Sequence, residues 1–425
     1  MRVWGGEAPL HAVDTTWVLI SAALVLFMTP GLAIFYGGMV RAKNVLAVMM
    51  NNLVAIGLVS VLWALFVASL AFGRDAGDGL IGNLSLSGLA SLPHRLAGFS
   101  HVGSSPLAIL TFQMMFAVIT AALISGGTID RIRFSAFVVF IALWLVLVYA
   151  PLAHWVFSPT GWLAERGALD FAGGTVVEIN SGFSTLAVVL VLGNRRGWPS
   201  ERMAPHSVPF SLLGVGILWF GWFGFNAGSS LGMNGVAVHA FANTQLAAAA
   251  GLLGWIVSER VRQSYPTTLG AASGAIAGMV AITPCAGFVT ATSSILIGAI
   301  AGVVCALAVR FKFRLRYDDS LDVLGVHGVG GLVGMVLLGL LATKGVNPRG
   351  ANGLLTGGGL HFFGVEMMAA GVAVAFSFVM TWLIAKVIDR TIGLRVTPEE
   401  ELAGLDLTQH AESAYSVGGM GRVGS

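Results

Sequence analysis

Residues 324–338 read LGVHGVGGLVGMVLL, an apolar run in which His327 is the only ionisable residue. A second run, VVEINSGFSTLAVVL at 176–190, contains one acid, Glu178. Each lies within an apolar stretch of about 20 residues, the length that a helix needs to cross the hydrocarbon core of a bilayer. An ionisable side chain costs at least about 2.5 kcal/mol at that depth, so both residues require a functional or structural reason.

The composition of the whole chain points to the same environment. Of its 425 residues, 56% are hydrophobic and only 10% are charged, whereas a soluble domain carries about 25% charged residues. This excludes a soluble globular protein, and a formal net charge of +3 is too small for a nucleic-acid binder. Cys285 and Cys305 form no CxxC motif, so we expect two small core residues, with no disulfide, metal site or cofactor.

Eleven apolar runs of suitable length follow one another along the chain, which predicts an all-α polytopic membrane protein with eleven transmembrane helices. The expected spans are 16–38, 45–72, 106–128, 134–156, 171–193, 207–230, 237–257, 268–286, 291–310, 321–342 and 362–388. An odd number of spans places the two termini on opposite sides of the membrane.

The distribution of basic residues predicts the orientation. With the N-terminus outside, 17 of the 23 Lys and Arg residues face the cytoplasm, and the remaining six are Arg2, Arg74, Arg95, Arg166, Lys344 and Arg349. The positive-inside rule therefore favours an outer N-terminus and a cytoplasmic C-terminus. Residues 1–15 lack a basic start followed by an apolar segment, so no cleavable signal peptide is predicted.

A short correspondence between two helices suggests an internal repeat. Asp170 precedes Glu178 by eight positions, as Asp319 precedes His327. This predicts two inverted repeats of five helices, about 16–193 and 207–342, with a peripheral last helix at 362–388. We expect a transmembrane domain at 1–388 and, since the chain turns polar beyond it, a cytoplasmic tail at 389–425.

If Glu178 and His327 face each other, they can take up and hand on a proton, because imidazole titrates near neutrality and a carboxylate favours its charged form. The alternative is that each is a hydrogen-bonded core group. The aromatic stretch WFGWFGFNAGSS at 219–230 allows a second site, in which ring faces and the Ser229 hydroxyl hold a small cation that donates hydrogen bonds. Core packing or lipid contact is the alternative for most of these rings.

Seven segments resemble the Amt/Mep/Rh ammonium transporter family, in the same order over nearly the whole chain. They are DTTWVLISAALVLFMTPGLAIFYGGMVRAKNVL (14–46), RIRFSA (131–136), DFAGGTVVEINSG (170–182), ILWFGWFGFNAGSS (217–230), SGAIAGMVAITP (273–284), DVLGVHGVGG (322–331) and IGLRVTPEEELAGLDLTQHAESAY (392–415). The resemblance implies a homotrimer in a bacterial inner membrane, with one narrow pore in each protomer.

The resemblance also implies roles for particular residues. Substrate recruitment falls to Phe116, Phe157, Ser229 and Asp170, the pore gate to Phe116 and Phe225, and the proton relay and pore wall to Glu178, His327 and Trp222. Two positions depart from the commoner pattern. Glu178 replaces the first pore histidine, and Phe157 stands where a tryptophan of the outer cage is expected, with Trp162 as the alternative cage residue.

The segment at 392–415 is similar to the part of the family that docks the PII signalling protein, which implies a regulatory tail containing Gly393, Arg395, Glu399, Gly404 and Asp406. The predicted function is transport of ammonium, and possible competition by methylammonium is left open. Ammonium is captured outside and deprotonated, and ammonia crosses while the proton follows the Glu/His pair. The alternative is an ammonium-sensing receptor that signals through its tail with little flux. A membrane enzyme has no supporting motif.

Overall fold

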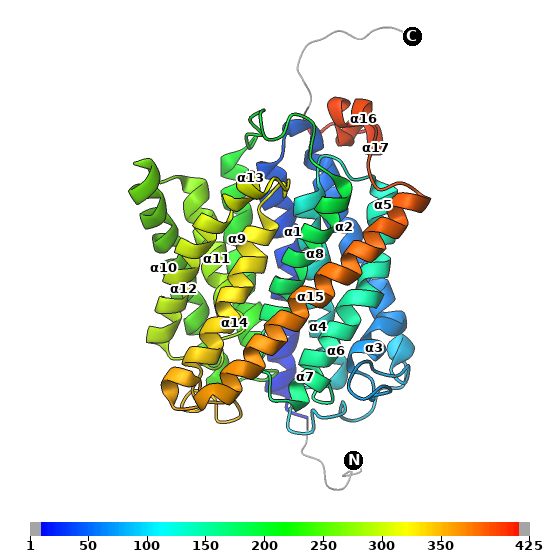
Figure 1. The fold of residues 1–425 in the computed structure, drawn as a ribbon. Helices are drawn as coiled ribbons and strands as arrows, with labels where there is room; N and C mark the ends of the chain where they lie inside the picture. Colours follow the sequence, from blue (N-terminus) through cyan, green and yellow to red (C-terminus); the bar gives the residue numbers. More distant parts are fainter. Residues whose placement is uncertain (1–9, 416–425) are drawn as a thin grey trace.

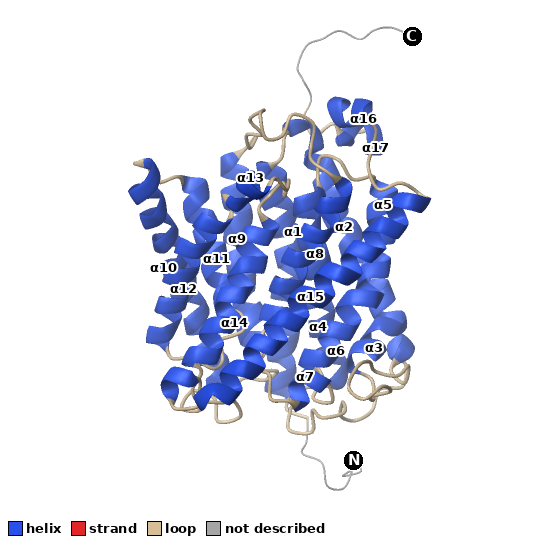
Figure 2. Ribbon diagram, viewed as in Figure 1, coloured by secondary structure: helices blue, strands red, loops and turns tan. Residues whose placement is uncertain are grey.

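The structure is a computed structural model and describes residues 10–415. Residues 1–9, which include Arg2, and residues 416–425, the end of the predicted tail, lie outside the described residues. Between residues 10 and 415 the chain forms helices and turns and contains no β-strand, which confirms the predicted all-α class (Figure 2).

The helices follow the apolar runs closely, because each run satisfies its backbone hydrogen bonds internally. In the first half they are α1 (Ala12–Met39), α2 (Val45–Leu62), α3 (Ala68–Phe72), α4 (Pro106–Thr128), α5 (Phe134–Trp144), α6 (Ala150–Phe157), α7 (Trp162–Glu165) and α8 (Asn180–Leu192). In the second half they are α9 (Val208–Gly228), α10 (Gly235–Gln263), α11 (Thr268–Ile282), α12 (Ala291–Ala308), α13 (Phe311–Leu315), α14 (Val329–Leu341), α15 (Gly359–Thr391), α16 (Pro398–Ala403) and α17 (Leu405–His410).

Ten of the eleven predicted spans are long and apolar enough to cross a bilayer within the described chain. Four of them include a π-helical turn, which joins α2 to α3, joins α5 to α6, or leads into α8 or α14. The eighth run forms α11, a helix of 15 residues. At 1.5 Å per residue it is about 22 Å long, shorter than the roughly 30 Å hydrocarbon core. The count of eleven crossings therefore stays a prediction at this helix.

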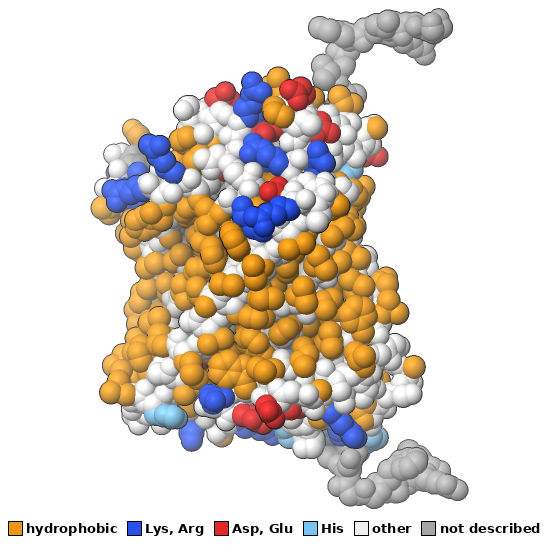
Figure 3. All heavy atoms as spheres, turned by 45° about the vertical axis from the view of Figure 1, so that its right-hand side comes forward, with side chains coloured by type: hydrophobic (Ala, Val, Ile, Leu, Met, Phe, Trp, Pro, Cys, Tyr) orange, Lys and Arg blue, Asp and Glu red, His pale blue; other side chains and the backbone are white. Residues whose placement is uncertain are grey.

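The long helices run side by side, with loops at both ends of the bundle (Figure 1). We call the end of the bundle that carries α16 and α17 the tail face, and the end where α1 begins the opposite face. A continuous belt of hydrophobic side chains lies between these faces on the side shown in Figure 3, and the ionisable side chains gather above and below it. This pattern identifies a multi-pass membrane protein.

Two helices meet at the centre of the bundle, and each begins with a wider π-helical turn. These turns, η5 (Gly174–Ile179) and η6 (Leu324–Gly328), continue directly into α8 and α14. Glycine allows the close approach: a Cβ on Gly182 would lie 2.3 Å from the Gly328 Cα atom, and one on Gly331 would lie 2.9 Å from the Glu178 Cβ atom. Such contacts are typical of small residues between membrane helices.

Each of these helices has at its head one of the two aspartates whose spacing suggests the repeat. Asp170 accepts hydrogen bonds from the Gly174 and Thr175 amides at 2.6 and 2.8 Å, and Asp319 accepts one from the Leu324 amide at 2.8 Å. The carboxylates satisfy amide groups that a helix start leaves without partners. Both aspartates cap equivalent turns, a local similarity that supports the predicted repeat.

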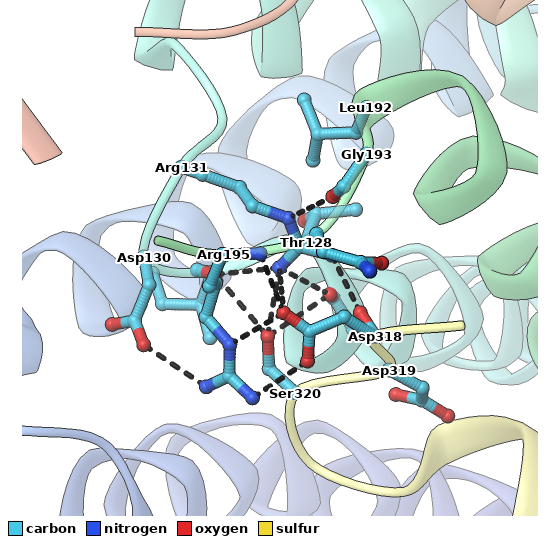
Figure 4. A network of polar contacts seen from close by, with 12 residues as sticks. Thr128, Asp130, Arg131, Leu192, Gly193, Arg195, Asp318, Asp319 and Ser320 are labelled. Carbon is cyan, nitrogen blue, oxygen red and sulfur yellow. Dashed lines mark hydrogen bonds and ion pairs between the residues drawn. The ribbon is translucent and has the colours of Figure 1, made fainter. Parts of the chain in front are cut away.

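A buried charge cluster ties three loops together at the tail face (Figure 4). Arg195 contacts Asp318 at 2.8 Å and Asp130 at 3.1 Å, and Arg131 donates to the Asp318 carbonyl oxygen and to Gly193 at 2.5 and 2.7 Å. Burial would raise the pKa of Asp318, but hydrogen bonds from Arg195 and the charge of Arg131 hold it below its usual value. The cluster fixes the segment from which η6 starts.

Candidate functional site

A cleft of about 520 Å³ opens on the opposite face, between the start of α1, the end of α9 and several loops. Asp170 and Ser229, two of the predicted recruitment residues, line this cleft. The Ser229 hydroxyl donates its hydrogen to the Phe225 carbonyl oxygen at 2.9 Å. Because a hydroxyl oxygen can also accept hydrogen bonds, Ser229 is left ready to accept one from a ligand in the cleft.

The Asp170 carboxylate accepts hydrogen bonds from the start of its own helix. Its two carboxylate oxygens accept hydrogen bonds from the Gly173, Gly174 and Thr175 amides and from the Thr175 hydroxyl, at 2.5 to 2.8 Å. Burial raises the pKa of Asp170, although these four hydrogen bonds act in the opposite direction. The residue therefore holds the wall of the cleft in shape.

Two stacked phenylalanine rings lie between the cleft and the interior. Phe116 and Phe225 are almost completely buried, and their ring centroids are 4.2 Å apart with an angle of 16° between the planes. Phe157 meets Phe116 edge-on, with their ring centroids 6.3 Å apart. Neither Phe116 nor Phe157, both predicted for recruitment, is among the residues that line the cleft itself.

The alternative cage residue, Trp162, has different neighbours. Its ring lies 5.8 Å from Trp155 and 5.0 Å from the Arg166 guanidinium carbon. Of the two candidates that the sequence leaves open, Phe157 is the one next to Phe116.

Narrow internal cavities continue from the stacked rings toward the tail face. The first has a volume of about 10 Å³ and is apolar except for Glu178, Trp222 and His327. The second, of about 30 Å³, begins at the other side of His327 and reaches Asp322. A cavity needs roughly 10–15 Å³ to hold one water molecule, so the first cavity has room for about one and the second for about two.

Glu178 and His327 meet inside this passage, as the two apolar runs predict. The Glu178 Oε2 atom is 2.7 Å from His327 Nδ1, and the two residues are 1% and 5% exposed. Each stands in a π-helical turn, η5 or η6. Such turns displace side chains from the regular helical pattern and are frequent at functional sites. The sequence gives no signal for these turns beyond the glycines that surround them.

Trp222 forms part of the passage wall, and a hydrogen bond fixes the orientation of its ring. Its indole Nε1 donates to the Thr283 hydroxyl at 3.0 Å, and Thr283 in turn contacts the Asn226 side chain at 3.3 Å. No pattern in the sequence points to Thr283, which lies near the end of the segment SGAIAGMVAITP. It holds the ring of Trp222 in place next to the passage.

The predicted tail folds back onto the tail face. Arg395 donates to the carbonyl oxygens of Leu192 and Asn194 at 3.1 and 2.8 Å and pairs with Glu401 at 2.7 Å. Asp406 accepts from the Ala47 amide at the start of α2 at 2.8 Å.

The other predicted tail residues lie in turns or face solvent. Gly393 and Gly404 have φ angles of +79° and +106°, a region that favours glycine, and Glu399 is exposed. The tail is thus attached to the bundle by backbone carbonyl groups and helix starts.

Comparison with known proteins identifies the family and supports the fold. The model of the Ammonium Transporter Family matches residues 16–415. This chain belongs to that family. An ammonium transporter of Mycobacterium bovis is 47% identical over 428 residues, which cover 95% of this chain and 90% of the relative.

Solved structures agree with the assignment of this chain to the ammonium transporter family. The crystal structure of Saccharomyces cerevisiae Mep2 has a TM-score of 0.84 and 34% identity, and the match covers 92% of this chain and 89% of that one. A structure titled Sensor Amt Protein has a TM-score of 0.85 and 30% identity, over 94% of this chain and 98% of that one.

Two further residues of the transporter's cleft were not predicted from the sequence. Asp14 and Arg349 both line it, together with Ser229. Asp14 lies in the segment DTTWVLISAAL, where an acid at the head of an apolar span was the available signal. Arg349 comes from the loop before α15, and its place at the cleft depends on tertiary packing alone.

Proposed function

We propose that this ammonium transporter moves ammonia and a proton separately. Ammonium is captured at Ser229 in the cleft and gives up one proton, so that an N–H bond breaks and its electron pair stays on nitrogen. Ammonia then passes Phe116 and Phe225 into the apolar passage. The proton follows Glu178 and His327, and ammonia takes up a proton again at the tail face.

The observation that carries this proposal is the contact between Glu178 and His327 in a passage too narrow and apolar to hydrate an ion. Moving an intact ammonium ion out of water would cost tens of kcal/mol in the idealised limit, whereas neutral ammonia loses only hydrogen bonds. Because one proton accompanies each ammonia, the net result is transfer of one positive charge.

The test is a current measurement on purified protein in proteoliposomes with an ammonium jump. Glu178→Gln keeps the size of the side chain and removes its proton-accepting carboxylate. We expect the current to fall to about a tenth of the wild-type value or less. Glu165→Gln, an exposed carboxylate at the opposite face, is the matched control and should leave the current unchanged. An undiminished current in Glu178→Gln would refute the relay.

The alternative function, an ammonium-sensing receptor, is tested by the same experiment. The likeness to the Sensor Amt Protein is the observation that favours this alternative. A receptor needs ammonium binding but little flux. Sustained ammonium-evoked current or ammonia flux through the wild-type protein would therefore exclude it, and binding without either would favour it.

We infer that the N-terminus lies outside and the tail in the cytoplasm of a bacterial inner membrane, since Lys and Arg gather at the tail face (Figure 3).

We further propose a homotrimer that binds a PII signalling protein through the tail. The docked tail contacts the loops around the inner end of the passage, which suits a regulator that acts there. Light scattering tests the trimer, and co-purification with PII tests the partner.

A further inference from the structure

The outer cleft contains two carboxylates, and they differ in what surrounds them. The oxygens of Asp170 are used by four hydrogen bonds from the head of its own helix. These donors compensate much of its charge. Asp14 is the other carboxylate, and it stands at the start of α1.

Asp14 accepts a hydrogen bond from the Met233 amide to Oδ1 at 2.9 Å, and it forms no ion pair within residues 10–415. Backbone of two loops lies directly against its side chain. A Cβ added to Gly103 would lie 2.3 Å from Asp14 Oδ2, and one added to Gly232 would lie 2.9 Å from Oδ1. The carboxylate is therefore held in one place, in the first turn of α1 and beside the ring of His11.

The effect of Asp14 on the net charge of the cleft depends on the basic groups that line it. Arg349 is exposed at its rim, and burial lowers the pKa of His101, so His101 is neutral at neutral pH. With both carboxylates the lining carries a net charge of one negative unit at that pH. Without Asp14, Asp170 and Arg349 would balance, and the cleft would no longer attract a cation.

We propose that Asp14 is a substrate-recruiting residue, whose negative charge concentrates ammonium in the outer cleft before it reaches Ser229. The inference rests on the proposed function, because it assigns a further residue to the same uptake route. A charged cleft raises the local concentration of the opposite charge, and this effect weakens as salt screens it. Asp14 therefore acts on the apparent affinity, while the maximal rate depends on the passage below.

The test compares Asp14→Asn with wild type in ammonium-evoked currents at several ammonium chloride concentrations and two ionic strengths. The asparagine oxygen can still accept from the Met233 amide, so the loop keeps its anchor. We expect the KM for ammonium to rise about three- to fivefold with an unchanged maximal current. The wild-type KM should increase with ionic strength, and that of the variant should change little.

Asp78→Asn is the matched control, because Asp78 is an exposed carboxylate of a loop that does not line the cleft. Its KM should equal that of wild type. An unchanged KM in Asp14→Asn, or an equal rise in both variants, would overturn the role of Asp14 while leaving the Glu178 relay intact. A wild-type protein without ammonium current would overturn both proposals. A lower maximal current in Asp14→Asn at unchanged KM would show a structural role and also overturn this one.

Discussion

At the scale of single residues, Glu178 is the feature that distinguishes this passage from the commoner family pattern of two histidines. A carboxylate in an apolar channel adds a negative charge when ionised, which a neutral imidazole does not. Its contact with His327 at 2.7 Å places that charge directly on the route between the two internal cavities. The side chain should therefore influence both proton transfer and the choice between cations.

Glu178→His tests this influence and restores the commoner pair. We expect ammonium transport to persist with a maximal current about two- to fivefold lower, because the passage attracts cations less strongly. Discrimination against potassium should become stricter for the same reason. Currents evoked by ammonium and potassium jumps measure both effects. A potassium response larger than that of wild type would contradict the argument.

At the scale of secondary structure, the crossing of η5 and α8 with η6 and α14 is what brings the pair together. Both helices begin on an aspartate cap, and both carry glycine where the backbones touch. The closeness of the backbones, rather than the hydrogen bond itself, sets the position of Glu178 and His327. A single methyl group at the contact would separate them.

Gly182→Ala introduces that methyl group. Its Cβ would lie 2.3 Å from the Gly328 Cα atom, and a backbone atom of a packed helix has no room to move away. Overpacking of this kind costs about 1–3 kcal/mol or more, so we expect a lower Tm in detergent and a strongly reduced ammonium current.

Gly364→Ala in α15 is the matched control, since a Cβ there would have no neighbour within 4 Å. Its Tm should be equal or slightly higher, because alanine favours the helix by about 0.5–1 kcal/mol. If Gly182→Ala behaved like this control, close packing at the crossing would not be what fixes the pair.

At the scale of the whole molecule, buried charges join parts of the chain that are far apart in sequence. Asp318 lies just before η6, Asp130 and Arg131 follow α4, and Arg195 follows α8. The tail packs on two of these loops. Arg395 donates to Leu192 and Asn194, and the Val396 amide donates to the Arg131 carbonyl oxygen at 3.0 Å. The inner end of the passage is consequently held by three loops and the tail at once.

Asp318→Asn removes one partner of this cluster and leaves Arg131 and Arg195 short of a counter-charge. Loss of one partner in a buried pair costs about 3 kcal/mol or more, so we expect a Tm several degrees lower at pH 7.5. Asp389→Asn, an exposed carboxylate at the end of α15, should leave the Tm unchanged.

The pH dependence of this difference has a definite sign. The pKa of Asp318 is lower in the folded protein than in the unfolded chain, so its stabilising effect is complete above the unfolded value and disappears as pH falls through the folded one. The difference in Tm should be equal at pH 7.5 and 5 and should shrink toward pH 3. A difference that grew on acidification would contradict the ion-pair explanation.

The apolar runs, their lengths and their two ionisable residues determined the all-α membrane fold and the identity of the central pair, because a bilayer imposes length and polarity on every segment that crosses it. The aspartate spacing likewise predicted both helix heads. Only the tertiary structure decided that Phe157 lies beside Phe116, that Asp14 and Arg349 share the outer cleft and that the tail packs on Arg131 and its neighbouring loops. Those contacts join residues tens to hundreds of positions apart, and their partners are selected by packing, which no local pattern in the chain records.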